Sequence, residues 1–231
     1  METKTPVSPY RNYEKTLDRN YSLVGEKSSV LAERKVRAFL NFLAQLNLGR
    51  KVKVLDIGCG VGLAEGVFKG SELIESVIGI DLCFESLQSA ASHPERPAHY
   101  LQADGFRLPM QDNSFDAVFT ICTLHHVSVE HRRDFLQEMR RVLRPGGWLF
   151  AFEHNPFNPV TRFFVRLCPF DRGCQLLRPG ELTQAFRQSD FCNVSRHFLI
   201  FFPSFMKTAL DFEKYLSWCP LGAQFFVSGK K

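Results

Sequence analysis

A chain of 231 residues is long enough to bury one continuous hydrophobic core, and we expect a single domain over residues 1–231. Its 45% hydrophobic and 23% charged residues exclude the disordered and fibrous classes. The formal net charge of +5 comes from scattered Lys and Arg, so it demands neither a nucleic acid nor an anionic membrane as partner.

The seven cysteines form no CxxC pair and show no zinc-ligand spacing, which predicts reduced thiols and no metal site. The first ten residues are too polar for the apolar core of a secretory signal, and the apolar run 198–202 is too short to span a bilayer. We therefore expect a cytoplasmic protein with no transmembrane segment. Contact with a membrane surface stays open, and the sequence gives no oligomeric state.

The N-terminal segment, residues 1–48, is predicted to form an arm followed by a lid helix. The arm, up to about Lys27, is polar and lacks a strong period. The helix begins near Ser29, a good N-cap, and ends at Asn47 and Gly49. Its apolar face is predicted to comprise Val36, Phe39, Leu40, Leu43 and Leu46.

From residue 52 onward, short apolar runs alternate with helical patterns. Strands are predicted at 52–57, 77–80, 98–101, 115–120 and 148–152. Helices are predicted at 63–68, at 84–91 and around 135–143, the last ended by the Arg-Pro-Gly-Gly run at 144–147. This alternation is typical of a parallel sheet covered by helices on both faces.

The last third, from residue 155 onward, is less regular. Helices are predicted at 160–167, 179–189 and 205–218, with strands at 194–202 and 223–227. Its phenylalanines could form the core of a cap over the sheet or line an apolar pocket: Phe157, Phe163, Phe164, Phe170, Phe201, Phe202 and Phe205. Its arginines could bind a phosphate or carboxylate: Arg162, Arg166, Arg172 and Arg178.

The strongest local signal is VLDIGCGVG at 54–62, a buried strand that enters a glycine-rich turn. Glycines there let a ligand touch the main chain directly. A dinucleotide site of the G-x-G-x-x-G type would need a glycine at position 63, which is Leu63. The turn alone therefore does not identify the nucleotide.

Two acids follow at successive strand ends. Asp81 lies 23 residues after Gly58 (81 − 58) and can accept hydrogen bonds from a ribose diol. Asp104 follows the third strand and can accept from an adenine amino group. Either acid alone could be a helix cap or turn residue, whereas the pair favours an adenosine cofactor.

The ordered motifs VLDIGCGVG, IGIDL, QADGFRLPMQDNSFDAVF, LHHV and RVLRPGGWLFAFEHNP resemble those of class I S-adenosylmethionine-dependent methyltransferases. The resemblance covers about residues 52–153 and is close to the small-molecule group that includes ubiquinone-biosynthesis enzymes. It implies a Rossmann-like three-layer α/β/α sandwich with a seven-stranded, mostly parallel sheet whose last strand is antiparallel. It also implies S-adenosyl-L-methionine as cofactor.

The resemblance also implies that residues 155–220 form a variable region on the side of the methyl acceptor, and it implies site residues. The wall against the methionine part would comprise Asp56, Gly58, Cys59, Gly60 and Gly62. Asp81 and Leu82 would hold the ribose, and Thr120 would lie close to the methionine end. Asp104, Gly105 and Phe106 would hold the adenine, and Tyr13 or Tyr21 of the arm would be lid contacts.

Methyl transfer from a sulfonium needs an aligned acceptor and exclusion of water, and for a hydroxyl acceptor also a base. The candidate catalytic residues are His126, His154 and His125, which follow the fourth and fifth strands; each could instead have a packing role. Glu153 could anchor an amine or orient His154. We expect a small-molecule acceptor, with a hydroxyl or an activated carbon favoured and no specific nucleic acid.

Three rival functions remain: a non-catalytic cofactor sensor, a protein or RNA methyltransferase, and an NAD oxidoreductase. The sensor would bind the cofactor without turnover. The macromolecular enzyme is disfavoured because Thr120–Leu124 reads TICTL rather than an Asn-Pro catalytic motif. The oxidoreductase is disfavoured by Leu63 and Asp104.

Overall fold

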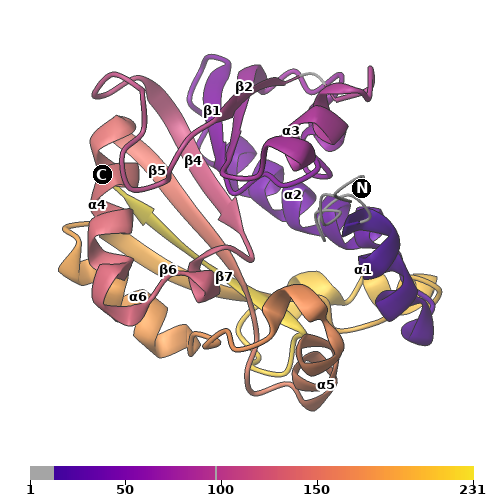
Figure 1. The fold of residues 1–231 in the computed structure, drawn as a ribbon. Helices are drawn as coiled ribbons and strands as arrows, with labels where there is room; N and C mark the ends of the chain where they lie inside the picture. Colours follow the sequence, from indigo (N-terminus) through magenta and orange to yellow (C-terminus); the bar gives the residue numbers. More distant parts are fainter. Residues whose placement is uncertain (1–12, 97) are drawn as a thin grey trace, which may run out of the picture.

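The structure, a computed structural model, describes residues 13–96 and 98–231 (Figure 1). The first twelve residues of the expected arm lie outside the described residues. Seven strands form one sheet in the order β3-β2-β1-β4-β5-β7-β6. Their bounds are β1 Val52–Ile57, β2 Ile74–Asp81, β3 His99–Gln102, β4 Phe115–Ile121, β5 Leu143–His154, β6 Cys192–Leu199 and β7 Gln224–Lys230.

The sheet confirms the predicted Rossmann-like class. Strands β1 to β5 pair in parallel, whereas β7 runs antiparallel to both β5 and β6. His154 at the end of β5 pairs with Gln224 at the start of β7, and Gln224 also pairs with Leu199 at the end of β6. The carboxyl ends of β1 to β6 and the start of β7 therefore share one edge of the sheet, where ligands of such folds bind.

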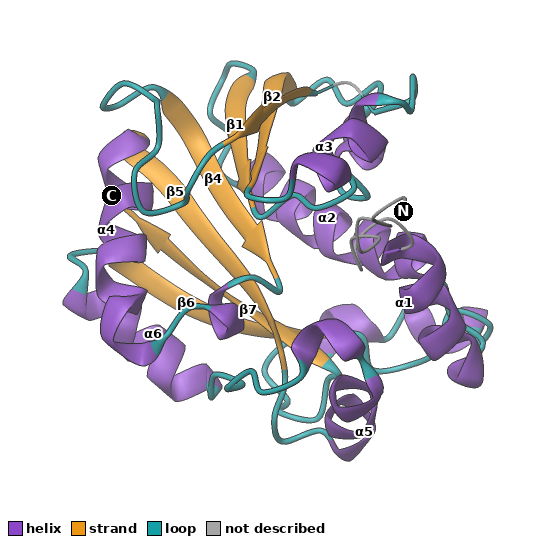
Figure 2. Ribbon diagram, in the orientation of Figure 1, coloured by secondary structure: helices purple, strands orange, loops and turns teal. Residues whose placement is uncertain are grey.

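Helices cover both faces of this sheet (Figure 2). Helix α2 packs on one face through Val36, Phe39 and Leu43, while α4 and α6 pack on the other. The aromatic side chains that dominate the α2 face lie in the core, with Phe39 4.9 Å from Phe150 between ring centroids. The helix bounds are α1 Tyr13–Tyr21, α2 Ser28–Gln45, α3 Phe84–Ala91, α4 Arg132–Val142, α5 Pro159–Leu167, α6 Pro179–Gln188 and α7 Lys207–Leu210.

Four segments differ from the sequence prediction. Part of the polar arm is α1, and residues 65–68 form a 3₁₀ turn rather than an α-helix. Strand β5 begins at Leu143, so it already includes the Arg-Pro-Gly-Gly run. The helix predicted at 205–218 is instead the short α7 and a 3₁₀ turn at 213–215, because its apolar side chains face outward and cannot pack a continuous helix against the sheet.

Within the described residues, no helix is both long and apolar enough to cross a membrane.

Candidate functional site

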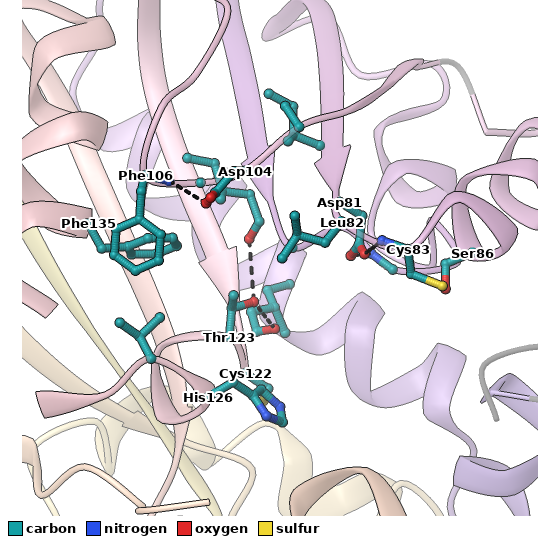
Figure 3. A pocket seen from close by; sticks show the side chains of 18 of the residues that line it. Asp81, Leu82, Cys83, Ser86, Asp104, Phe106, Cys122, Thr123, His126 and Phe135 are labelled. Carbon is teal, nitrogen blue, oxygen red and sulfur yellow. Dashed lines mark hydrogen bonds between the residues drawn. The ribbon is translucent and has the colours of Figure 1, made fainter. Parts of the chain in front are cut away.

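A cavity of about 820 Å³ opens at the carboxyl ends of β1, β2 and β4 (Figure 3). Asp81 and Asp104 line it from neighbouring strand ends, with Thr123 and His126 further along its wall. The cavity collects the residues expected to bind the ribose and adenine of a cofactor, two glycines expected beside its methionine part, and one expected histidine. These are Gly58, Gly60, Asp81, Leu82, Asp104, Gly105, Phe106 and His126.

The glycine-rich loop is held at this edge by Asp81. One carboxylate oxygen accepts from the Gly60 amide and the other from the Cys83 amide, each at 2.8 Å. Gly58 has a φ of +77°, and a Cβ at that position would clash with Thr123. Each carboxylate oxygen has a second lone-pair direction, so Asp81 can still accept from a ligand in the cavity.

The loop after β3 is fixed in a similar way. Asp104 accepts from the Phe106 amide at 2.9 Å, and the Phe106 ring packs edge-on against Phe135 with centroids 5.2 Å apart. A Cβ on Gly105 would overlap the Phe135 ring, so glycine is required there. Phe106 is left as one exposed wall of the cavity, suited to contact a flat ring.

A second cavity, of about 100 Å³, shares Tyr13, Gly58, Gly60 and Cys122 with the first. It is also lined by Asp56, Cys59 and the buried side chain of Lys35. Lys35 comes from α2 and has no sequence motif that marks it.

Asp56 lies beside Glu65 in the interior. Burial, followed by the charge of Glu65, raises the pKa of Asp56, and burial raises the pKa of Glu65 to about 7. The Oδ1 atom of Asp56 accepts from no N–H or O–H donor of the chain when Asp56 and Glu65 are ionised, and a proton on one carboxyl would join the two. A buried carboxyl oxygen without such a donor in a cavity wall is suited to accept from a ligand's ammonium group.

A third cavity, of about 270 Å³, is lined mainly by apolar side chains. Leu17, Tyr21, His154, Cys168 and Asp171 line both it and the second cavity. The three cavities therefore form a row along the strand ends, with His154 and Asp171 where the apolar one meets the others.

His125 is held between two carboxylates. Its Nδ1 lies 2.7 Å from Glu153 and its Nε2 lies 3.2 Å from Asp171. Burial alone would lower the pKa of His125, but the two carboxylates outweigh it and raise that pKa to about 11. The ring is therefore an imidazolium at neutral pH, and its side chain is fully buried, which makes it a structural centre of the site rather than a free base.

Glu153 also accepts from the Leu124 amide at 2.8 Å and is fully buried. The structure thus makes it the partner of His125, and neither expected role, anchoring an amine or orienting His154, agrees with this geometry. Asp171, which no motif marked, has its pKa lowered to about 2 because the hydrogen bond from His125 outweighs burial.

The other two histidines are uncharged at neutral pH. Burial and the charge of His125 lower the pKa of His126, and lower that of His154 to about 4. His126 faces the first cavity, and its Nδ1 lies 3.0 Å from the Cys174 sulfur. His154 lines the second and third cavities, with Nδ1 3.4 Å from the Gln224 amide nitrogen.

Two expected contacts lie outside all three cavities. Thr120 is completely buried within β4, because the strand continues to Ile121 and the chain turns at Cys122, where φ is +54°. The threonine that reaches the cavity is Thr123. Gly62 instead lies against α3, where a Cβ would meet Ala90 and the Tyr100 hydroxyl.

The seven phenylalanines that were expected to form a cap core or a pocket divide into two groups, and none of them is fully buried, because each is half-buried or exposed. Phe164, Phe201 and Phe202 line the third cavity, and Phe170 lines the first. Phe157, Phe163 and Phe205 are exposed. The four arginines expected to bind an acceptor anion, Arg162, Arg166, Arg172 and Arg178, are all exposed and line none of these cavities.

Among the described residues, two histidine-containing groups lie close enough to hold a metal ion: His125 with His126 and Cys174, and His125 with His154 and Asp171. Both need His125, whose two ring nitrogens each face a carboxylate. A protonated ring has no lone pair for a metal, so this geometry favours the ion-paired arrangement.

Comparison with known proteins agrees with the geometry. Residues 55–151 match a family described as a methyltransferase domain. A malonyl-[acyl-carrier protein] O-methyltransferase from Marinomonas is 31% identical over 150 residues, which are 63% of this chain and 54% of that protein. A probable tRNA methyltransferase 9B from Bos taurus is 35% identical over 100 residues, 43% of this chain and 20% of that protein.

The chain spans about half, or less, of the length of these curated relatives. Among solved structures, a SAM-dependent methyltransferase from Archaeoglobus fulgidus superposes with a TM-score of 0.69 at 17% identity, covering 91% of this chain and 99% of that one. This similarity extends the shared fold beyond residues 55–151 to nearly the whole chain.

Proposed function

We propose that this chain, whose residues 55–151 match a methyltransferase domain, is a class I methyltransferase with S-adenosylmethionine as its cofactor, and that it methylates a small apolar molecule. The acceptor atom in this proposal is a hydroxyl oxygen or an activated carbon of an apolar, aromatic or lipid-linked compound. The observation that carries the proposal is the continuous row of cavities, in which an acid-lined pocket and an apolar one meet at His154 and Asp171.

The donor groups of the first two cavities suit the cofactor. Asp81 and Asp104 can accept from its ribose hydroxyls and adenine amino group, and the Oδ1 of Asp56 can accept from its ammonium. The amine of Lys35, in the wall of the second cavity, is suited to its carboxylate. Lys35 therefore joins the candidate cofactor-binding residues.

When bound, S-adenosylmethionine supplies an electrophilic methyl group and a leaving group that departs uncharged. The chain's own task is to hold the acceptor in line and keep water out. Tyr13, Leu17 and Tyr21 of α1 line the row of cavities and so close it from one side. Burial raises the pKa of both tyrosine hydroxyls, which remain neutral hydrogen-bond donors.

His154 is the residue best suited to receive a proton from an acceptor hydroxyl. It is uncharged and buried, and it lies in the wall shared by the second and third cavities. Its contact with Gln224 orients the ring. His125, Glu153 and Asp171 together carry one net negative charge, but burial and the imidazolium of His125 lower the pKa of His154 to about 4, so that His154 keeps a free lone pair at neutral pH.

Calorimetric titration with S-adenosylmethionine, S-adenosylhomocysteine and NADH tests the cofactor part of the proposal. We expect saturable binding of both sulfur ligands and none of NADH. An acceptor screen with phenolic and lipid-linked hydroxyls, read as S-adenosylhomocysteine formed, tests the transfer. Binding without turnover for any acceptor would favour the sensor alternative.

For the active acceptor, His154→Ala should lower turnover by about 10²–10⁴-fold if His154 is the base. His126→Ala is the matched control, because His126 faces the first cavity alone. A larger loss in the control would transfer the base role to His126.

A tRNA acceptor is the second candidate, favoured by the 35% identity to the tRNA methyltransferase over 100 residues. The same assay with bulk tRNA separates the two. Turnover with tRNA and with no small molecule would replace the small-acceptor proposal.

A further inference from the structure

Helix α5 carries an apolar face that is about half exposed. Val160, Phe163 and Leu167, at positions i, i+3 and i+7, are 52%, 55% and 43% exposed. The opposite face, with Thr161 and Val165, is buried. An amphipathic helix normally turns its apolar stripe inward, so this outward stripe needs another explanation.

The segment between β6 and β7 adds further exposed apolar side chains. The Asn158 amide, just before α5, donates to the Leu221 carbonyl at 2.7 Å, which joins this segment to the helix. In Figure 1, α1, α5 and this segment lie at one end of the molecule. The apolar surface, as we call it, comprises Leu23, Phe157, Val160, Phe163, Leu167, Phe205, Met206, Phe212, Tyr215, Trp218 and Leu221.

The apolar surface borders the third cavity. Val160 belongs to both the surface and the cavity lining. Two other lining residues, Val24 and Pro203, lie within two residues of the exposed Leu23 and Phe205. The Phe205 ring also lies 3.4 Å from where a Cβ on Gly25 would be, so these two stretches meet.

The charges around the apolar surface are mainly positive. Helix α5 contains Arg162 and Arg166, both exposed, and no acid. Lys207 and Lys214 are exposed in the second segment. Of the two acids there, Glu213 is paired with Arg34 at 2.5 Å, so Asp211 is the one left to offset four cations.

We propose that the apolar surface docks on an anionic lipid bilayer and that the acceptor enters the third cavity from the lipid. A basic amphipathic helix with Phe, Trp and Tyr beside it suits the region between lipid headgroups and acyl chains. The entry of the acceptor rests on the proposed function, whereas the docking does not.

The experiment is vesicle co-sedimentation of the full chain. Vesicles of phosphatidylcholine alone are compared with vesicles containing about a third phosphatidylglycerol. We expect binding to the anionic vesicles that weakens as salt rises from about 0.1 to 0.5 M. Trp218 is 74% exposed and Trp148 is buried, so a blue shift of tryptophan fluorescence reports that the apolar surface itself enters lipid.

The double variant Phe163→Asp/Leu167→Asp should weaken vesicle binding by about tenfold or more. Both side chains are exposed and neither lines a cavity, so S-adenosylhomocysteine affinity should not change. Leu48→Asp is the matched control, because Leu48 is 40% exposed and precedes β1 at the other edge of the sheet. The control should bind vesicles as the unmodified chain does.

Three outcomes would overturn the docking. These are no binding to anionic vesicles, equal loss in the Leu48→Asp control, and self-association in solution that the double variant abolishes. The last would make the apolar surface an interface between two copies. If the chain bound vesicles but no S-adenosylhomocysteine, the proposed function would be wrong and the docking proposal would still be supported.

Discussion

Asp81 serves two purposes at one strand end, because it holds the glycine-rich loop and faces the first cavity. We expect Asp81→Ala to weaken S-adenosylmethionine binding by about 1–3 kcal/mol, from lost ribose hydrogen bonds and a looser loop. Calorimetry measures this loss of binding free energy. Glu75→Ala, in the same strand, is the control, because Glu75 pairs with Lys53 far from the cavity. Unchanged affinity in a folded Asp81→Ala protein would remove Asp81 from the site.

His125 should be a major stability residue. Replacing it with Ala leaves Glu153 and Asp171 without their shared cation, which should cost about 3–5 kcal/mol in the free energy of unfolding at pH 6. Because its folded pKa, about 11, lies above the unfolded value, the wild-type advantage is complete below about pH 6.5 and shrinks as pH rises toward 11.

Urea unfolding at pH 6, 8 and 9.5 checks this prediction, and His99→Ala, an exposed histidine on β3, is the control. A difference between wild type and His125→Ala that grows with pH would contradict an imidazolium at this position.

We expect helix α1 to be the element that a bound ligand stabilises most. It has nine residues, most of them half-buried and none fully buried, and a helix of that length is marginal alone. It is held by the pair of hydrogen bonds from Ser28 to Asp18, at 2.7 and 2.6 Å, and by Tyr13 against Phe170. Bound cofactor would add contacts beneath Tyr13.

We therefore expect S-adenosylhomocysteine to slow hydrogen exchange in residues 13–21 more than in α6, which lines none of the cavities. Mass spectrometry of exchanged peptides measures it. Protection limited to the loop at 58–62 would mean that α1 does not act as a lid.

The elements differ in how far the sequence could predict them. Strands such as β1 and β4 are buried along most of their length, so their continuous apolar runs indicate both type and place. At 205–218 the apolar residues are exposed, and their spacing therefore carries no information about packing. Helix α1 escaped prediction because its stability comes from contacts with distant segments rather than from an apolar stripe of its own.

The residues of the candidate site also differ in how far the sequence could predict them. Gly58, Asp81 and Asp104 follow strands directly, so strand order alone brings them together. Asp171 and Lys35 come from segments whose position over the sheet no local pattern encodes. The pairing of His125 with Glu153 likewise depends on β4 and β5 being neighbours, which converts two residues 28 apart into a 2.7 Å contact.

At the scale of the molecule, the prediction of one domain over residues 1–231 is testable by unfolding. β7 lies between β5 and β6, so the acceptor-side region is bound into the same sheet as the cofactor side. We expect one thermal transition by circular dichroism and by fluorescence. S-adenosylhomocysteine at about 100 times its Kd should stabilise it by about 2.7 kcal/mol.

That stabilisation corresponds to a rise in Tm of roughly 5–10 °C for a chain of this size. A second transition that does not move with ligand would mean that residues 155–220 unfold as a separate unit.

The lining of the three cavities by α1 also has a kinetic consequence. Tyr13, Leu17 and Tyr21 are four residues apart, so they form one stripe that extends about 12 Å along a single rigid helix. The helix cannot lift from one ligand and stay closed over the other. Occupancy at either end should therefore slow escape from the other, and by reciprocity the two affinities should rise together. In such an enzyme the release of the two products would be coupled, and opening of the helix rather than methyl transfer would be rate-limiting.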